Sequence, residues 1–66
     1  MKFELDEIIV HNETGLKVII DFITPTHSCI KQADGKRYQI LNYTLEKTFR
    51  RASAEEKKLF RSSNHE

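Results

Sequence analysis

The residues of this chain best suited to chemistry are its single cysteine and its histidines. Cys29 and His27 are separated by one residue, so on a strand both side chains would lie on one face, and His11 could approach them in space. Zinc takes four ligands, usually with paired Cys-x-x-Cys spacing, and a cysteine nucleophile needs a base and an orienting group in reach. The sequence has neither pattern. We therefore expect no metal site, no cofactor, no catalytic residues and no enzymatic activity, with Cys29 in a structural role.

Basic side chains interleaved with aromatic ones are the second candidate for chemistry. Lysine and arginine contact phosphates and aromatic rings stack on bases, so the combination is typical of nucleic-acid recognition. The predicted nucleic-acid or partner-binding residues are Lys36, Arg37, Tyr43, Arg50, Arg51, Lys57, Lys58, Leu59 and Phe60. Solvated surface charges around an aromatic core would give the same pattern, and that interpretation stays open.

Charge is unevenly distributed along the chain, although the net charge is only +1. Residues 1–25 carry two lysines against five acidic residues, a net charge of −3, and residues 26–66 carry nine basic against five acidic residues, a net charge of +4. This asymmetry predicts one basic surface, which would attract phosphate backbones or an acidic protein patch.

Length and composition restrict the class of protein. A chain of 66 residues forms one domain with a small core, and a single cysteine excludes an intramolecular disulfide, which favours a reducing compartment. The acidic residues near the N-terminus exclude the apolar core of a signal peptide, and no apolar run reaches membrane-spanning length. We therefore expect a cytoplasmic protein that has neither a membrane nor a small-molecule substrate as its partner.

The alternation of apolar and polar residues predicts four strands, over residues 7–11, 16–23, 28–32 and 36–41. The second of these carries apolar side chains on both faces, so we expect a long, bent strand that is partly buried on both sides. Its main apolar face is predicted to consist of Leu16, Val18, Ile20 and Phe22.

An Asp-Gly pair between the last two of these strands predicts a β-hairpin. A two-residue loop would place Lys31 on the same face as Tyr38 and Ile40. A three-residue loop that ends at Gly35, in the left-handed conformation, would instead pair Ile30 with Tyr38. We therefore predict the three-residue loop.

The C-terminal third is predicted to contain a turn over residues 42–47 and a short strand over residues 47–50. The alternative is a helix over residues 43–51, with Leu41, Leu45 and Phe49 on one face. A capping-box pattern, with Ser53 at the N-cap and Glu56 three residues later, predicts a helix over residues 54–61. Residues 62–66 are predicted to be a disordered tail.

The C-terminal helix has a narrow apolar stripe, in which Leu59 and Phe60 are the only large apolar side chains. We expect such a stripe to dock weakly. Truncation after Ala52 should then leave the melting temperature nearly unchanged and abolish partner binding.

The layout of short strands with a single turn before the last one resembles that of SH3-like small barrels of the KOW and Tudor kinds. Leu5-Asp6-Glu7-Ile8-Ile9-Val10, with Gly15 in the following turn, is similar to the opening strand and loop of a KOW motif. Lys17 and Val18 stand where such motifs carry a second glycine, so ribosome or polymerase binding is not implied. The resemblance covers roughly Phe3 to Arg50. Together with the capping-box pattern, it predicts a mainly β fold: a barrel of about five antiparallel strands over residues 1–52, with a short helix over residues 53–61.

Two functions are compatible with these features. The first is a non-enzymatic binding module that engages nucleic acid or a nucleoprotein machine through its basic face. The alternative is a small protein-binding adaptor or inhibitor, of the kind that phages and mobile elements encode, which acts on a larger host protein.

Overall fold

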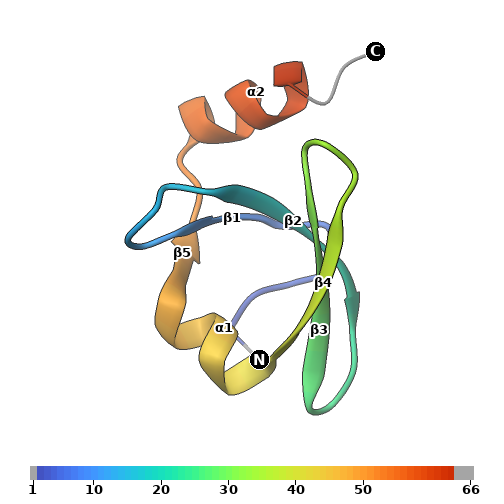
Figure 1. Cartoon of the computed structure of the whole chain (residues 1–66). Helices are drawn as coiled ribbons and strands as arrows, with labels where there is room; N and C mark the ends of the chain where they lie inside the picture. The colour runs from blue at the N-terminus through green and yellow to red at the C-terminus, as the bar shows by residue number, and fades with distance from the viewer. Residues whose placement is uncertain (1, 64–66) are drawn as a thin grey trace.

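The computed structural model describes residues 2–63, which form five strands and two helices (Figure 1). In chain order these are β1 (Ile8–His11), β2 (Lys17–Ile23), β3 (His27–Gln32), β4 (Arg37–Leu41), α1 (Asn42–Thr48), β5 (Phe49–Arg51) and α2 (Ala54–Ser63). The prediction of a mainly β protein with a short C-terminal helix is confirmed. Of the predicted tail, residues 62 and 63 continue α2, and residues 64–66 lie outside the described part of the chain.

All strand pairs are antiparallel, in the order β4-β3-β2-β1-β5. The two edge strands, β4 and β5, do not pair with each other within residues 2–63, so the sheet is not closed into a barrel. Figure 1 shows α1 crossing from the end of β4 to the start of β5. The arrangement is therefore compatible with a small barrel-like fold whose open side lies between its two edge strands.

The β3–β4 hairpin has the predicted three-residue loop. Ile30 pairs with Tyr38, and Gly35 has a φ of +95°. The backbone N–H of Gly35 donates to the carbonyl of Gln32 (3.0 Å), and the N–H of Gln32 donates to the carbonyl of Lys36 (2.8 Å). The left-handed conformation at the third loop position explains why glycine occupies it.

β2 departs from simple alternation at a β-bulge. The pairing register with β3 shifts between Ile20 and Phe22, which reverses the face of every later side chain. Ile20 is therefore buried, whereas Phe22 is 61% exposed and Ile23 packs against the core. The prediction that Phe22 shares the buried face is wrong, and the expectation of a bent strand buried partly on both sides is confirmed.

Residues 42–51 combine the two predicted alternatives. The expected turn is instead a helix of seven residues, α1, and the expected short strand follows it as β5. Leu45 and Phe49 are both buried, the first on a helix and the second on a strand that pairs with β1. The four-residue spacing of Leu45 and Phe49 therefore predicted a helix that was too long. The helix ends at Thr48, because Phe49 pairs with His11 of β1.

Two apolar clusters lie on opposite faces of the sheet. The inner cluster consists of Phe3, Ile9, Val18, Ile20, Ile30, Leu45 and Phe49. The outer cluster consists of Ile8, Val10, Ala52 and Phe60, with Ile19 and Ala33 packed against it. Because consecutive residues of β1 point to opposite faces, this strand contributes to both clusters.

α2 covers the outer cluster and is capped as predicted. The N–H of Glu56 donates to Ser53 Oγ (3.2 Å), and the N–H of Ser53 donates to Glu56 Oε1 (2.8 Å), which is a complete capping box. Phe60 is only 4% exposed. The expected weak docking of this helix is therefore replaced by a buried anchor, because the sheet offers a second apolar face that the helix sequence alone does not reveal.

Candidate functional site

Three of the predicted basic residues are held in ion pairs with carboxylates. Arg50 makes two hydrogen bonds to Glu56, from Nη1 to Oε1 and from Nη2 to Oε2, both of 2.9 Å. The pKa of Glu56 is lowered to about 2, mainly by the hydrogen bonds from the Arg50 guanidinium and then by the backbone N–H of Ser53. Hydrogen bonding to Glu56 in turn raises the pKa of the Arg50 guanidinium. Arg50 therefore connects β5 to the start of α2.

Arg51 and Arg37 also form ion pairs with carboxylates. Arg51 Nε lies 2.6 Å from Glu7 Oε2, and its Nη2 donates to the backbone carbonyl of Lys2 (2.7 Å). Arg37 Nε lies 3.0 Å from Asp21 Oδ2. These guanidinium charges are largely compensated, so they are weaker attractants for phosphate than their number in the sequence suggests.

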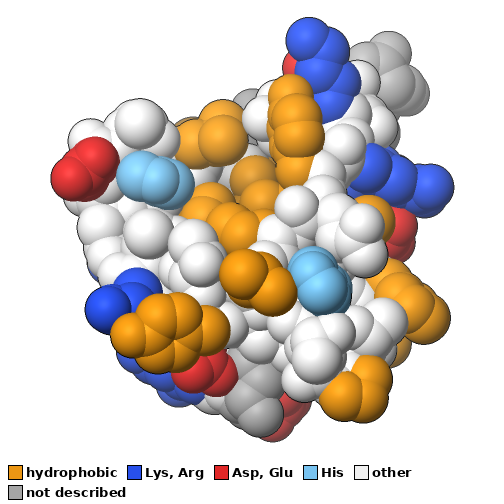
Figure 2. Space-filling view, turned by 60° about the horizontal axis from the view of Figure 1, so that its bottom comes forward, with side chains coloured by type: hydrophobic (Ala, Val, Ile, Leu, Met, Phe, Trp, Pro, Cys, Tyr) orange, Lys and Arg blue, Asp and Glu red, His pale blue; other side chains and the backbone are white. Residues whose placement is uncertain are grey.

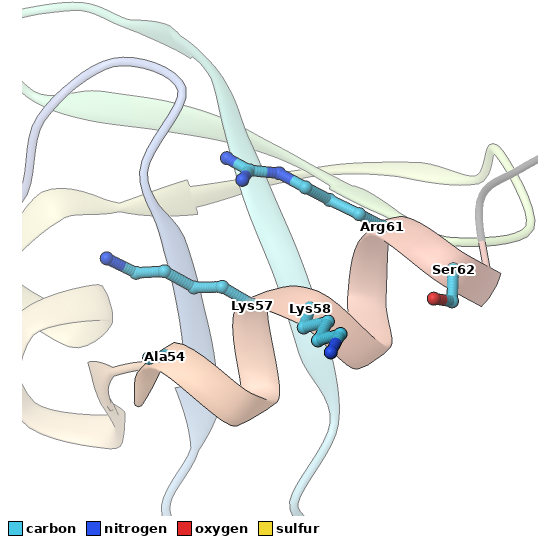
Figure 3. A pocket seen from close by; sticks show the side chains of 5 residues that line it. All are labelled: Ala54, Lys57, Lys58, Arg61 and Ser62. Atoms are coloured by element: carbon cyan, nitrogen blue, oxygen red, sulfur yellow. The ribbon is translucent and has the colours of Figure 1, made fainter.

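Free basic side chains gather on α2. Lys57, Lys58 and Arg61 line an open hollow of about 510 Å³ together with Ala54 and Ser62 (Figure 3). Lys57 and Arg61 extend in the same direction from successive turns, whereas Lys58 points elsewhere, as Figure 3 shows. Among residues 2–63, no carboxylate lies within ion-pair distance of these three side chains.

The remaining predicted site residues do not join this basic face. Tyr43 is 70% exposed on α1, where Lys47 Nζ lies 3.0 Å from its hydroxyl and 4.8 Å from the centroid of its ring. Figure 1 places α1 and α2 at opposite ends of the molecule. Lys36 is exposed beside the β3–β4 loop, and on α2 Leu59 is exposed whereas Phe60 is buried.

A second feature is the exposure of large apolar side chains on several elements. They are Leu5, Leu16, Phe22, Tyr38, Leu41, Tyr43 and Leu59. Figure 2, which views the molecule from the α1 end, shows hydrophobic side chains gathered near the centre of this face, with basic side chains toward its margins. The alternating pattern of β4 did predict an apolar face. The position of β4 at the sheet edge, which leaves Tyr38 of that face about half exposed, follows only from the topology.

His11 and His27 have local partners, and neither forms a metal site with Cys29 in the described part of the chain. His11 Nδ1 accepts the backbone N–H groups of Glu13 (3.1 Å) and Thr14 (3.2 Å), and its ring packs edge-on against Phe49. His27 Nδ1 lies 2.8 Å from Thr26 Oγ1. Within the described chain no three His, Cys, Asp or Glu side chains are grouped so that they could hold a metal ion.

Comparison of the chain with protein-family models, curated proteins and solved structures finds no match. Neither helix in residues 2–63 has the length and apolar character needed to cross a membrane.

Proposed function

We propose that this protein is a non-enzymatic binding module that engages nucleic acid through a basic face, which is the surface of α2 around the hollow lined by Lys57, Lys58 and Arg61. The observation that supports this function is the presence of three basic side chains on one helix without carboxylate partners among the described residues. Such side chains can replace the counterions of a phosphate backbone, which favours binding at low salt.

The attachment of α2 to the sheet supports the same function. Phe60 anchors one face of the helix, and the Ser53–Glu56 capping box orders its first turn. The basic face therefore lies on a fixed element, which reduces the entropy lost on binding. The strand order is also consistent with the resemblance to SH3-like barrels of the KOW and Tudor kinds, which we retain as part of the proposal.

Fluorescence anisotropy with labelled single- and double-stranded DNA and RNA, over a salt series, tests this function. We expect binding at low salt, with a log–log salt slope of roughly −2 to −3 for three phosphate contacts. The triple variant K57Q/K58Q/R61Q should lose this binding. The matched control K31Q/K36Q/K47Q removes the same charge from other elements and should retain most of it. Absence of binding at low salt, or equal losses in both variants, would contradict the proposal.

A second candidate function is that of a small adaptor or inhibitor that binds a larger protein. It is favoured by the exposed apolar side chains, among which Phe22 is 61% exposed on the outer face of β2. Exposed aromatic residues are common anchors of protein interfaces. A stoichiometric protein partner that is captured by the wild type and by Leu5→Ser, but not by Phe22→Ser, would support it. Capture that does not depend on Phe22 would exclude this surface.

A further inference from the structure

β4 has exposed side chains on both faces, and within residues 2–63 one of its edges is unpaired. Four of its five residues are exposed, and Ile40 is half-buried. The strand order gives it a single neighbour, β3. An uncovered edge with apolar side chains is a template for pairing with another strand.

The hydrogen-bond pattern identifies the free backbone groups. The N–H of Gln32 donates to Lys36, and the N–H of Asn42 donates to Thr26, so the even-numbered residues of β4 face β3. Arg37, Gln39 and Leu41 therefore direct their N–H groups away from β3. The carbonyls of Arg37 and Gln39 also point outward, whereas that of Leu41, at the N-cap of α1, accepts the first helical hydrogen bond.

We propose that the chain forms a symmetric dimer in which β4 pairs antiparallel with β4 of a second copy, with Gln39 opposite Gln39 at the two-fold axis. In this register the two Gln39 residues exchange backbone hydrogen bonds. The N–H of each Leu41 donates to the carbonyl of Arg37 in the other copy. An isologous contact of this kind closes at two copies and leaves no further edge of the same type.

The side chains of β4 are self-complementary in this register. On the inner face, Tyr38 lies opposite Ile40 of the second copy, an aromatic–β-branched pair that covers exposed apolar surface on both chains. On the outer face, Arg37 lies opposite Leu41, so its aliphatic stem contacts an apolar side chain. Shifting the register to place Tyr38 opposite Tyr38 would instead set Lys36 against Ile40, which is less favourable.

The charges of β4 are compatible with pairing between like chains. Asp21 compensates Arg37 within each copy. The two Arg37 residues are separated by four positions along the paired strands, roughly 14 Å. No like charges therefore face each other, and a second copy is a suitable occupant of the edge. The paired segment is short, so we expect a small interface and a dissociation constant of roughly 10–100 μM.

Sedimentation velocity of the full chain from about 10 μM to 1 mM tests the dimer, in a range set by this expected affinity. The average mass should rise from the 7.8 kDa of the monomer toward twice that value. Gln39→Pro removes a backbone N–H that makes no hydrogen bond to β3, so the average mass of this variant should stay at that of the monomer. Gln39→Ala keeps the N–H and should dimerise. A chain that is still monomeric at 1 mM would overturn the proposal, and a strand of another protein would then be the remaining candidate for pairing with β4. Species larger than a dimer would also overturn it.

A cross-link tests the register even if Gln39→Pro fails to fold. Residues in a hydrogen-bonded antiparallel pair have Cα atoms about 5.5 Å apart, a distance that a disulfide can bridge. In a Cys29→Ser background, Gln39→Cys should therefore form a disulfide-linked dimer on mild oxidation. The control Glu13→Cys, at an exposed position in the turn between β1 and β2, should not. Equal cross-linking of both variants, or none at position 39 in a chain that does dimerise, would overturn the proposed interface.

Discussion

β1 and β4 are strands of similar length with opposite environments. Ile8, Ile9 and Val10 of β1 are at most 1% exposed, and the strand pairs with β2 on one edge and β5 on the other. In β4, Tyr38 and Leu41 are about half exposed, and among the described residues only β3 pairs with this strand. The difference follows from position in the sheet, because both strands carry branched or aromatic residues that suit a sheet equally well.

This difference separates the part of the molecule that maintains the fold from the part that is available to a partner. The inner core, α2 and β5 all meet at β1, so changes there should affect stability most. β4 contributes fewer buried contacts, so changes on its exposed faces should affect association more than stability. Four predictions test this division, from the largest expected effect to the smallest.

The largest effect is expected where α2 covers β1. Phe60→Ala should lower the free energy of unfolding by about 3–5 kcal/mol, since it removes a buried aromatic side chain and leaves a cavity against Ile8 and Val10. Urea denaturation followed by circular dichroism measures this change. Leu59→Ala alters the adjacent, exposed residue and should cost less than about 1 kcal/mol. Equal effects of the two substitutions would show that α2 does not dock as the structure describes.

Gly35→Ala tests how β4 is held in place. An added Cβ would meet no atom within 4 Å, so any cost comes from the backbone φ of +95° alone. We expect a loss of about 1–2 kcal/mol in the free energy of unfolding. Lys36→Ala, in the next position, is the matched control and should have little effect. A loss below 0.5 kcal/mol for Gly35→Ala, on the order of a neutral surface substitution, would show that the turn relaxes readily.

Ser53→Ala should have a smaller effect, at the N-terminus of α2. The substitution removes the side-chain oxygen that accepts the N–H of Glu56, and loss of such a cap costs about 1 kcal/mol. Ser53→Asp replaces the acceptor and should restore most of the stability. If both variants have the stability of the wild type in thermal denaturation, the cap does not contribute to the attachment of α2.

The strands and the capped helix could be predicted because their signals are local. Alternation located β1 to β4, and the Asp-Gly pair located the β3–β4 hairpin, whose loop length followed from the apolar register of its strands. The spacing of Ser53 and Glu56 located the start of α2. Each of these depends on residues close in sequence, for which steric limits and hydrogen-bond geometry are decisive. The bulge after Ile20 could not be predicted in this way, because it is defined by pairing with a different strand.

The candidate sites depended on long-range contacts and were therefore predicted less well. Arg51 meets Glu7 across 44 positions of sequence, and no local pattern indicates that pair. The same holds for Phe60, which appears exposed when its helix is considered alone but is buried against β1 and β2. The composition of the basic region was evident from the sequence, but which of its charges are compensated was not.

The smallest effect is expected from acid titration of Glu56. Its carboxylate binds Arg50 of β5, the strand that pairs with β1, and so links β5 to α2. Its pKa is lowered from an ordinary value of 4.5 to about 2, mainly by the Arg50 guanidinium and then by the N–H of Ser53. Because the folded state has the lower pKa, the ionised carboxylate stabilises the fold fully above about pH 4.5. This contribution is lost as the pH falls toward 2.

Glu56→Gln removes that titration and should lower the melting temperature near pH 7, with the difference from the wild type shrinking between pH 4.5 and about 2. Glu55→Gln makes the same charge change one residue away and serves as the matched control. The Arg50–Glu56 pair is partly exposed, so salt should also reduce the difference at pH 7. A difference that stays constant from pH 7 to 2 would show that the effect of the substitution does not arise from the ionised carboxylate. In that case the connection between β5 and α2 would depend on Phe60 and the neutral hydrogen bonds of the cap.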